Sequence, residues 1–268
     1  MGSRAPGGVL SASPTALRVI AAEAARLAGE LLRERFVAGG EQAVGSKSSS
    51  TDPVSEADIA AEQAIRELLA VRRPDDAILG EEGGETQQGE GLRWIVDPLD
   101  GTVNFLFAIP QWCVSVAVHD DDGGLAGVVF DPLRDELFAA ERGGPATLNG
   151  LPVTGSSCGR LSSALVATGF GYESSVREAQ AAVVARALPL VRDIRRMGSA
   201  ALDLAWLAAG RYDAYYERGV KTWDIAAGAL LCECAGMAVR PLPERDGAPA
   251  GLVVAPPGLI DDLAALVE

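Results

Sequence analysis

Histidine is nearly absent from this sequence, because His119 is the only one among 268 residues. It follows the apolar run from Trp112 to Val118 and precedes a turn at residues 120–124. We therefore expect His119 to be a surface residue at the end of a strand. Such a residue is a poor candidate for a general base or a phosphorylated nucleophile. The scarcity of histidine thus disfavours hydrolysis and phosphotransfer that depend on an imidazole.

Cysteine is scarce as well, and the spacing of its four copies excludes a zinc site built from cysteine pairs. The cysteines are Cys113, Cys158, Cys232 and Cys234. The last two are two positions apart in a predicted helix, so their side chains face different directions. We expect unpaired, buried thiols and a cytoplasmic location, because thiols persist in a reducing compartment.

Long apolar runs and an excess of basic residues are also missing. No apolar run is long enough to span a bilayer, and residues 1–12 lack the core of a signal peptide, so we expect a flexible leader there. The 23 Lys and Arg residues face 37 Asp and Glu residues, a formal net charge of −14, which disfavours unspecific nucleic-acid binding. The hydrophobic fraction of 48% indicates a folded globular protein.

The most informative stretch runs from Trp94 to Phe105. Its first three residues are apolar and predict the end of a buried strand, and Pro98 keeps Asp97 extended at the strand tip. Gly101 permits a sharp turn, after which Thr102 can begin a helix whose free N–H groups point back toward the strand. The two acids would repel an anion that the start of the helix attracts. A divalent cation between the acids removes this conflict. The cation and the amides can then bind a phosphate together.

This stretch, WIVDPLDGTVNF, resembles the signature of the inositol monophosphatase family. That family belongs to the lithium-sensitive, magnesium-dependent sugar phosphatases, together with fructose-1,6-bisphosphatase. A second family signature appears at residues 223–228, WDIAAG, and other pieces match in the expected order from Lys47 to Gly236. Several motifs in the right order are a more specific signal than one.

The predicted fold is α/β, a layered sandwich. Strands and helices alternate without strict βαβ regularity, which disfavours a doubly wound sheet. The resemblance implies the α-β-α-β-α sandwich of fructose-1,6-bisphosphatase. We expect one compact catalytic unit, in which residues 1–12 are a leader, residues 13–155 form an N-terminal lobe with the metal and phosphate loop, and residues 156–268 form a C-terminal lobe.

Helices are predicted over residues 13–36, 55–71, 175–190, 199–209, 224–234 and 259–267. Strands are predicted over residues 78–79, 94–96, 112–118, 125–130, 136–140, 165–168, 213–216 and 250–255, with a hairpin at 147–153.

The resemblance implies which residues bind magnesium, with two to three Mg²⁺ per site. Glu81, Asp97 and the backbone carbonyl of Leu99 would hold a first ion. Asp97, Asp100 and Asp224 would hold a second, and a third, weaker ion would lie near Glu81 with mostly water ligands. Oxygen ligands suit this cation, and the cations would keep neighbouring carboxylates ionised.

The resemblance also implies the catalytic groups. Gly101 and Thr102 would present backbone N–H groups to the phosphate. Asp58 and Thr102 would pair by a hydrogen bond and, with Glu81, help to orient or deprotonate the attacking water. Metal-activated water would attack phosphorus in line, so no nucleophile from the protein and no phosphoenzyme are expected.

Two further segments, residues 198–200 and 215–219, are similar to the parts of the family that contact inositol. By that match the Ala200 amide, Asp100 and Glu217 would bind hydroxyl groups of the substrate. Lys221 occupies a position where animal members carry histidine, which is a departure toward the bacterial type. Further possible contacts are Lys47, Ser199 and Lys221.

Each assigned acid has a simpler alternative. Asp97 and Asp100 could be solvated turn residues, Asp224 could be only a helix cap, and Asp58 could merely suit the helix dipole. Glu82 is expected to be solvated, and with Asp52 it stands outside the ligand set. Lys47 could be an ordinary loop charge.

We therefore expect a magnesium-dependent, lithium-inhibited phosphomonoesterase that hydrolyses myo-inositol 1-phosphate and related polyol phosphates. Histidinol phosphatase, fructose-1,6-bisphosphatase and 3′-phosphoadenosine nucleotidase are alternatives on the same framework. A regulatory or RNA-machinery partner that keeps the fold and acts by binding is an alternative of another class. By analogy we expect a homodimer through the region around Arg192 to Arg196, and no membrane partner.

Overall fold

The computed structural model describes residues 13–38, 44–46, 53–86, 91–245 and 248–268. The predicted leader at 1–12, Lys47 and Asp52 lie outside the described residues.

The helices are α1 (Pro14–Ala38), α2 (Glu56–Arg72), α3 (Thr102–Leu106), α4 (Ser174–Ala187), α5 (Ala200–Ala208), α6 (Thr222–Cys234) and α7 (Ile260–Val267), and a 3₁₀ turn covers Leu161–Ser163. A short antiparallel pair joins β1 (Val44–Ser46) and β2 (Pro53–Ser55).

The larger sheet has the order β10-β9-β8-β7-β6-β5-β3-β4. Its strands are β3 (Ala77–Gly80), β4 (Gly84–Glu85), β5 (Arg93–Asp100), β6 (Cys113–Asp120), β7 (Gly123–Asp131), β8 (Glu136–Glu141), β9 (Thr147–Leu148) and β10 (Leu151–Pro152). The smaller sheet has the order β12-β11-β13-β15-β14, with β11 (Leu165–Thr168), β12 (Asp193–Arg195), β13 (Ala214–Arg218), β14 (Ala238–Leu242) and β15 (Gly251–Ala255).

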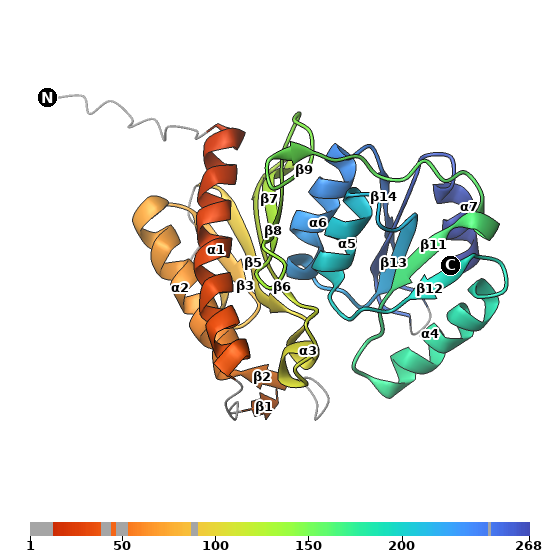
Figure 1. Ribbon diagram of the computed structural model, residues 1–268, viewed down its shortest axis with the longest axis horizontal. Coiled ribbons are helices and arrows are strands. Elements are labelled where there is room, and N and C mark those ends of the chain that lie inside the picture. Colours follow the sequence, from red (N-terminus) through yellow and green to blue (C-terminus); the bar gives the residue numbers. More distant parts are fainter. Residues whose placement is uncertain (1–12, 39–43, 47–52, 87–90, 246–247) are drawn as a thin grey trace, which may run out of the picture.

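The elements form five layers, which Figure 1 shows from left to right. Helices α1 and α2 pack their alanine-rich faces on one side of the larger sheet, around residues such as Leu17, Ile65 and Trp94. Helices α5 and α6 fill the space between the two sheets, and α7 packs on the far side of the smaller sheet, against Val253. The predicted α-β-α-β-α sandwich is confirmed. The division into lobes at residue 155 stays a prediction.

Strand β5 differs from the prediction in a way that shapes the site. The strand does not end at Val96 but continues to Asp100, so Asp97 lies inside it rather than at its tip. Between Asp97 and Asp100 the pairing with β6 shifts register. Such a bulge bends a strand and re-aims its side chains, and Pro98, which lacks an N–H, is tolerated there. The prediction missed β1, β2, β4, β12 and β14 as well.

Two residues expected at the surface are less exposed than predicted. His119 is half-buried, its Nε2 atom has no contact with solvent, and burial together with the charge of Arg142 lowers its pKa. Glu82 is also half-buried, with its Oε1 atom shielded from solvent. The four cysteines are free, as predicted. Cys113 and Cys232 are buried, but Cys158 and Cys234 are only partly buried, so the expectation of buried thiols holds for two of the four.

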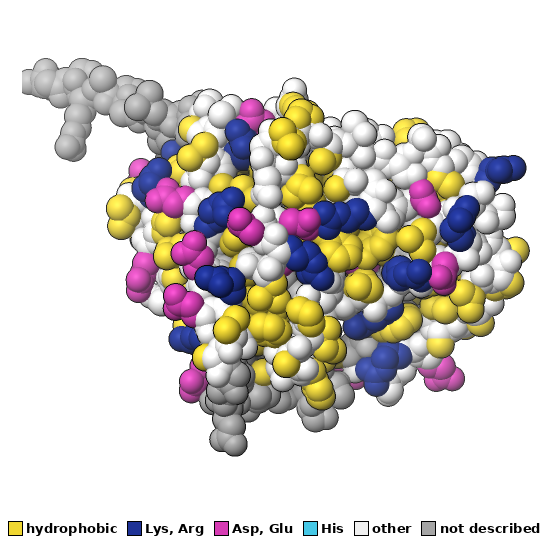
Figure 2. Space-filling model, viewed as in Figure 1, with side chains coloured by type: hydrophobic (Ala, Val, Ile, Leu, Met, Phe, Trp, Pro, Cys, Tyr) yellow, Lys and Arg dark blue, Asp and Glu magenta, His cyan; other side chains and the backbone are white. Residues whose placement is uncertain are grey.

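No helix within the described residues combines the length and apolarity needed to cross a bilayer. On the face shown in Figure 2, Lys and Arg side chains lie beside Asp and Glu side chains rather than in a separate basic patch.

Candidate active site

A cavity of about 370 Å³ opens where the larger sheet, the middle helices and β13 meet. Predicted site residues that line it are Glu81, Asp97, Leu99, Asp100, Gly101, Thr102, Ser199, Ala200, Glu217, Lys221 and Asp224. Asp58 does not line the cavity but lies behind Thr102. The volume is within the range typical of small-molecule sites. Residues far apart in the sequence thus share one concave surface.

The bulge in β5 directs Asp97 and Asp100 to different partners. The Oδ1 atom of Asp97 accepts a hydrogen bond from the Leu99 N–H at 3.0 Å, and only 2% of Asp97 is exposed. The Oδ2 atom of Asp100 accepts hydrogen bonds from the Ser199 hydroxyl at 2.8 Å and from the Ala201 N–H at 2.6 Å. Asp100 is therefore held against the start of α5, in the middle layer.

Gly101 begins the short helix α3 in the left-handed conformation, with φ of 103°. A Cβ at this position would lie 3.0 Å from the Gln111 carbonyl oxygen, so only glycine fits the turn without strain. The next residue, Thr102, places its Oγ1 atom 3.1 Å from Asp58 Oδ1 and 3.1 Å from the Leu99 carbonyl oxygen. The predicted hydrogen bond between Thr102 and Asp58 is therefore present.

Asp224 lies in the first turn of α6, as predicted. Its Oδ2 atom accepts a hydrogen bond from the Lys221 N–H at 2.6 Å, so the carboxylate caps the helix. The Ser115 hydroxyl donates to the Trp223 carbonyl at 3.3 Å, which ties this helix start to β6 beside Asp97. Capping occupies one carboxylate oxygen and leaves the other available to a ligand.

Burial and neighbouring charges raise the pKa values of three carboxyl groups in the cavity. Loss of hydration and the charges of Glu81, Asp100 and Asp224 raise the pKa of Asp97 well above its usual value. Loss of hydration also raises the pKa of Asp100 to about 6, although Ser199 opposes the shift. The same loss, together with the charge of Asp100, raises the pKa of Asp224. A cation between these groups would relieve the repulsion.

Among the residues that the structure describes, no three His, Cys, Asp or Glu side chains already share the geometry of a metal site. Instead, Asp97, Asp100 and Asp224 are held by the backbone and hydroxyl donors described above. The donor chemistry fits a hard cation all the same, because the cavity offers the carboxylates of these residues and of Glu81 together with a backbone carbonyl.

The far wall of the cavity is built by β13. The Tyr215 hydroxyl donates a hydrogen bond to Glu217 Oε2 at 2.8 Å. Loss of hydration raises the pKa of Glu217 to about 7. A Cβ on Gly169 would lie 2.1 Å from the Glu217 carboxylate oxygens. Glycine at position 169 therefore lets this carboxyl group pack against the chain just after β11.

The sequence did not predict the outer part of this wall. The missed lining residues include Phe170, Tyr172, Val176, Arg196 and Pro249. Arg196 lies over the Phe170 ring at 5.7 Å. Nothing in their local sequence distinguishes them from loop residues, apart from the glycines at 169 and 171, so they are found only when the chain is folded.

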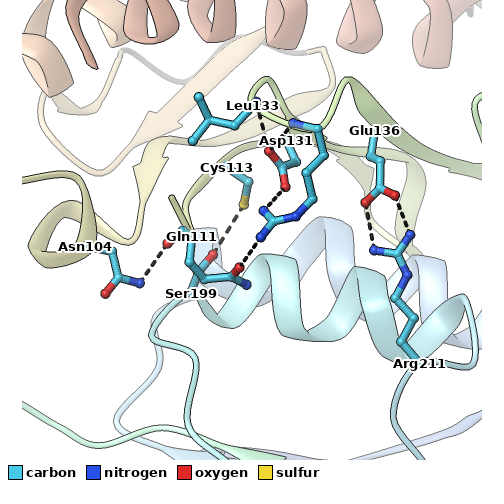
Figure 3. A network of polar contacts seen from close by, with 9 residues as sticks. Asn104, Gln111, Cys113, Asp131, Leu133, Glu136, Ser199 and Arg211 are labelled. Carbon is cyan, nitrogen blue, oxygen red and sulfur yellow. Dashed lines mark hydrogen bonds and ion pairs between the residues drawn. The ribbon is translucent and has the colours of Figure 1, made fainter. Parts of the chain in front are cut away.

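Asn104, in α3, links the segment that follows α3 to the segment that precedes α5. Its Nδ2 atom donates to the Gln111 carbonyl at 2.7 Å and to the Met197 carbonyl at 2.8 Å. Nearby, the Cys113 Sγ and Ser199 Oγ atoms are 3.5 Å apart. Figure 3 shows Asn104, Gln111, Cys113 and Ser199 in this region. The segment around α3 and the segment before α5 are thereby fixed relative to each other.

The fold agrees with comparisons to known proteins. The sequence model of the inositol monophosphatase family matches residues 13–267. The chain belongs to this family and has the fructose-1,6-bisphosphatase-like fold. Members of the family are generally metal-dependent. Membership of the family supports the assignment of this chain as a phosphatase.

Relatives carry two kinds of name. The "Inositol-1-monophosphatase SuhB" of Mycobacterium tuberculosis is 44% identical over 276 residues, covering 95% of this chain and 94% of the relative. The "Nus factor SuhB" of Escherichia coli K12 is 40% identical over 219 residues, covering 81% of this chain and 82% of the relative. One name describes an enzyme and the other a factor.

Solved structures share the fold over almost the whole chain. The native structure of the extragenic suppressor protein suhB from Bartonella henselae superposes with a TM-score of 0.87 and 35% identity, covering 94% of this chain and 98% of that one. Mycobacterium tuberculosis SuhB superposes with a TM-score of 0.81 and 40% identity, covering 95% and 96%.

Proposed function

We propose that this protein is a magnesium-dependent phosphomonoesterase that hydrolyses myo-inositol 1-phosphate and related polyol phosphates. The observation that carries the proposal is the convergence of Glu81, Asp97, Asp100 and Asp224 on one cavity beside the Gly101–Thr102 turn. Burial raises the pKa values of Asp97, Asp100 and Asp224, and bound cations would favour the ionised form of these three carboxyl groups.

The residues would divide the cation ligands among them. Glu81, Asp97 and the Leu99 carbonyl would hold a first Mg²⁺, and Asp97, Asp100 and Asp224 a second, with a third ion near Glu81. When bound, the cations supply Lewis-acid activation and neutralise the charge of the phosphoryl group. The Leu99 carbonyl oxygen and Asp58 Oδ1 both lie 3.1 Å from Thr102 Oγ1 and share its single proton. A lone pair of the carbonyl oxygen therefore remains for a cation.

The chain's own groups would position the phosphate and the water. Gly101 and Thr102 line the cavity at the start of α3, and their amides would bind phosphate oxygens. The Thr102 hydroxyl, 3.1 Å from the buried Asp58 carboxylate, would orient the attacking water and pass its proton toward that carboxylate. Glu81 would help to orient or deprotonate the same water.

The alcohol part of the substrate would contact the α5 and β13 sides. Asp100, the Ala200 amide and Glu217 border this part of the cavity, and each can engage neighbouring hydroxyl groups. Ser199, Lys221 and Lys47 are further candidates, of which Lys47 lies outside the described residues. A polyol with adjacent hydroxyls therefore suits the site.

A substrate panel tests this proposal. Initial rates are measured with inositol 1-phosphate, histidinol phosphate, fructose 1,6-bisphosphate and 3′-phosphoadenosine 5′-phosphate, each with Mg²⁺ and with chelator. We expect the highest kcat/KM for inositol 1-phosphate and no turnover in chelator. Full turnover after removal of divalent cations would refute the mechanism, and a higher kcat/KM for another substrate would replace the assignment.

A second candidate function rests on the relatives named as Nus factors. We propose that the chain can also act by binding RNA machinery, with the phosphatase fold as the scaffold. Pull-downs with wild type and with Asp97→Asn separate the two roles. A binding role predicts that Asp97→Asn recovers the same partners while hydrolysis is lost.

We also propose that the protein is a cytoplasmic homodimer inhibited by lithium. The region around Arg192 to Arg196 contains β12, an edge strand of the smaller sheet, and such edges are available for association. Light scattering of wild type and Arg192→Glu measures the oligomeric state, and rates with added Li⁺ measure inhibition.

A further inference from the structure

Glu62 is a buried acid that the proposed mechanism does not use. It lies on α2 one helical turn beyond Asp58, and 2% of it is exposed. Its carboxylate accepts hydrogen bonds from the Glu82 N–H, on Oε2 at 2.8 Å, and from the Gly83 N–H, on Oε1 at 2.8 Å. These two amides belong to the turn that follows β3 and that carries Glu81. Glu62 therefore contacts the backbone immediately after a proposed cation ligand.

Arg66 completes the contact one turn further along α2. Its Nε atom donates to Glu62 Oε1 at 2.7 Å, and its terminal nitrogen donates to the Gly84 carbonyl at 2.7 Å. Each side of the ion pair thus holds a different part of the same turn. Because residues at i and i+4 share a face of a helix, α2 presents Asp58, Glu62 and Arg66 along one face.

Glycine at two positions is what lets the turn approach this buried carboxylate. A Cβ on Gly80 would lie 2.5 Å from the Glu62 carboxylate, and a Cβ on Gly83 would lie 2.7 Å from its Oε1 atom. Both distances are shorter than real Cβ contacts. The glycines on either side of Glu81 and Glu82 therefore have a physical reason, which is close packing against Glu62.

We infer that Glu62, braced by Arg66, is a positioning residue that fixes the backbone of the 80–84 turn and so presents Glu81 to the cation. Through Asp58 and Thr102 the same helix face also positions the phosphate loop. The inference rests on the proposed function only in taking Glu81 as a cation ligand. Outer partners of this kind orient ligands without touching the ion.

The test compares Glu62→Gln with wild type in two measurements. One is the Mg²⁺ concentration that gives half-maximal activity, and the other is the binding of Mn²⁺ followed by electron paramagnetic resonance without substrate. The glutamine amide would place a donor against a backbone N–H and would lose the charge that Arg66 pairs with. We expect both cation affinities to fall by about 10- to 100-fold, with kcat at saturating Mg²⁺ and KM close to wild type.

Two further variants keep the result interpretable. Glu67→Gln, on the exposed face of α2, should leave the cation affinities unchanged. Gly83→Ala introduces the clash with Glu62 Oε1 and should weaken cation binding in the same direction. If thermal melting shows that Glu62→Gln is unfolded, Gly83→Ala takes its place, and the positioning role is judged by the cation affinities of Gly83→Ala.

The outcomes separate this inference from the proposed function. If wild type needs no divalent cation, the proposed function fails. If wild type needs the cation but Glu62→Gln binds it as wild type does, or loses kcat while cation binding is intact, the positioning role is overturned.

Discussion

Glu217 shows how a single residue couples the site to the stability of the fold. It lies on the cavity wall, with its carboxyl group bonded to the Tyr215 hydroxyl at 2.8 Å. Burial raises its pKa from 4.5 to about 7. The folded protein therefore holds a proton on Glu217 over a pH range in which the unfolded chain has released it. Stability is highest below that range and decreases as the pH rises through it.

The first prediction follows from this shift. In chelator, wild type should lose stability between about pH 5 and pH 8, and Glu217→Gln should lose less, because its amide is neutral in both states. The shift in the pKa of Glu217 corresponds to a loss of unfolding free energy that is larger in wild type than in Glu217→Gln by on the order of 3 kcal/mol. Urea denaturation at the two pH values measures it. Equal pH dependence in both proteins would show that Glu217 titrates normally.

At the scale of single residues, the sequence predicted which acids belong to the site better than it predicted the contacts that hold them. Asp97, Asp100 and Asp224 were found because they stand in local motifs with proline, glycine or tryptophan beside them. Glu62 was not found, because its partners are the backbone amides of residues 82 and 83. A contact between a side chain and a distant backbone leaves no local pattern in the sequence.

At the scale of elements, α6 combines packing with chemistry. It carries Asp224 in its first turn and packs against α5 in the middle layer. A Cβ on Gly228, one turn later, would lie 2.5 Å from Leu204 Cβ and 2.7 Å from its Cδ1 atom. Gly228 therefore sets how closely the two middle helices approach, and with it where Asp224 meets the larger sheet.

The second prediction concerns this approach. Gly228→Ala gains about 1 kcal/mol of helix propensity, but the clash costs about 1–3 kcal/mol. We expect the clash to dominate, because the atom it meets is a Cβ and cannot swing aside. Denaturant unfolding should show a net loss of stability. Gly258→Ala, where the new Cβ would meet nothing within 4 Å, is the matched control and should stay within about 0.5 kcal/mol. A Gly228→Ala variant as stable as the control would contradict this account.

The prediction from sequence was least complete for the helices and strands. Most long helices and strands were predicted with ends close to those observed, since apolar periodicity and caps determine them. The continuation of β5 through Pro98 was not, because a bulge depends on the register with β6, which is a tertiary property. The short edge strands β4, β12 and β14 lack a periodic pattern of their own.

At the scale of the whole molecule, the proposed cation ligands come from separate layers. Asp97 and Asp100 lie on β5 of the larger sheet, Glu81 follows β3, and Asp224 begins α6 between the sheets. A cation bound by these groups would link the larger sheet to the middle helices. Binding to the folded state alone then stabilises the whole fold by mass action. The raised pKa values mean that protons compete with the cation for the same oxygens.

The third prediction is that Mg²⁺ stabilises the protein more at about pH 8 than at about pH 5. At the higher pH, Asp100, with a pKa of about 6, is ionised without the help of a cation. At the lower pH the cation must displace its proton. A hundredfold excess over the dissociation constant adds about 2.7 kcal/mol, which for a chain of this size is a rise in melting temperature of roughly 5–10 °C.

Thermal melts with and without Mg²⁺ at the two pH values measure this difference. Asp224→Asn keeps the shape of the α6 start and removes one proposed ligand, so the Mg²⁺-dependent rise should shrink at about pH 8. Glu67→Gln removes a carboxylate on the exposed face of α2 and should leave the rise intact. If Mg²⁺ raises the melting temperature equally at both pH values and in all three proteins, its binding does not involve the buried carboxyl groups. The cation would then have no part in joining the layers.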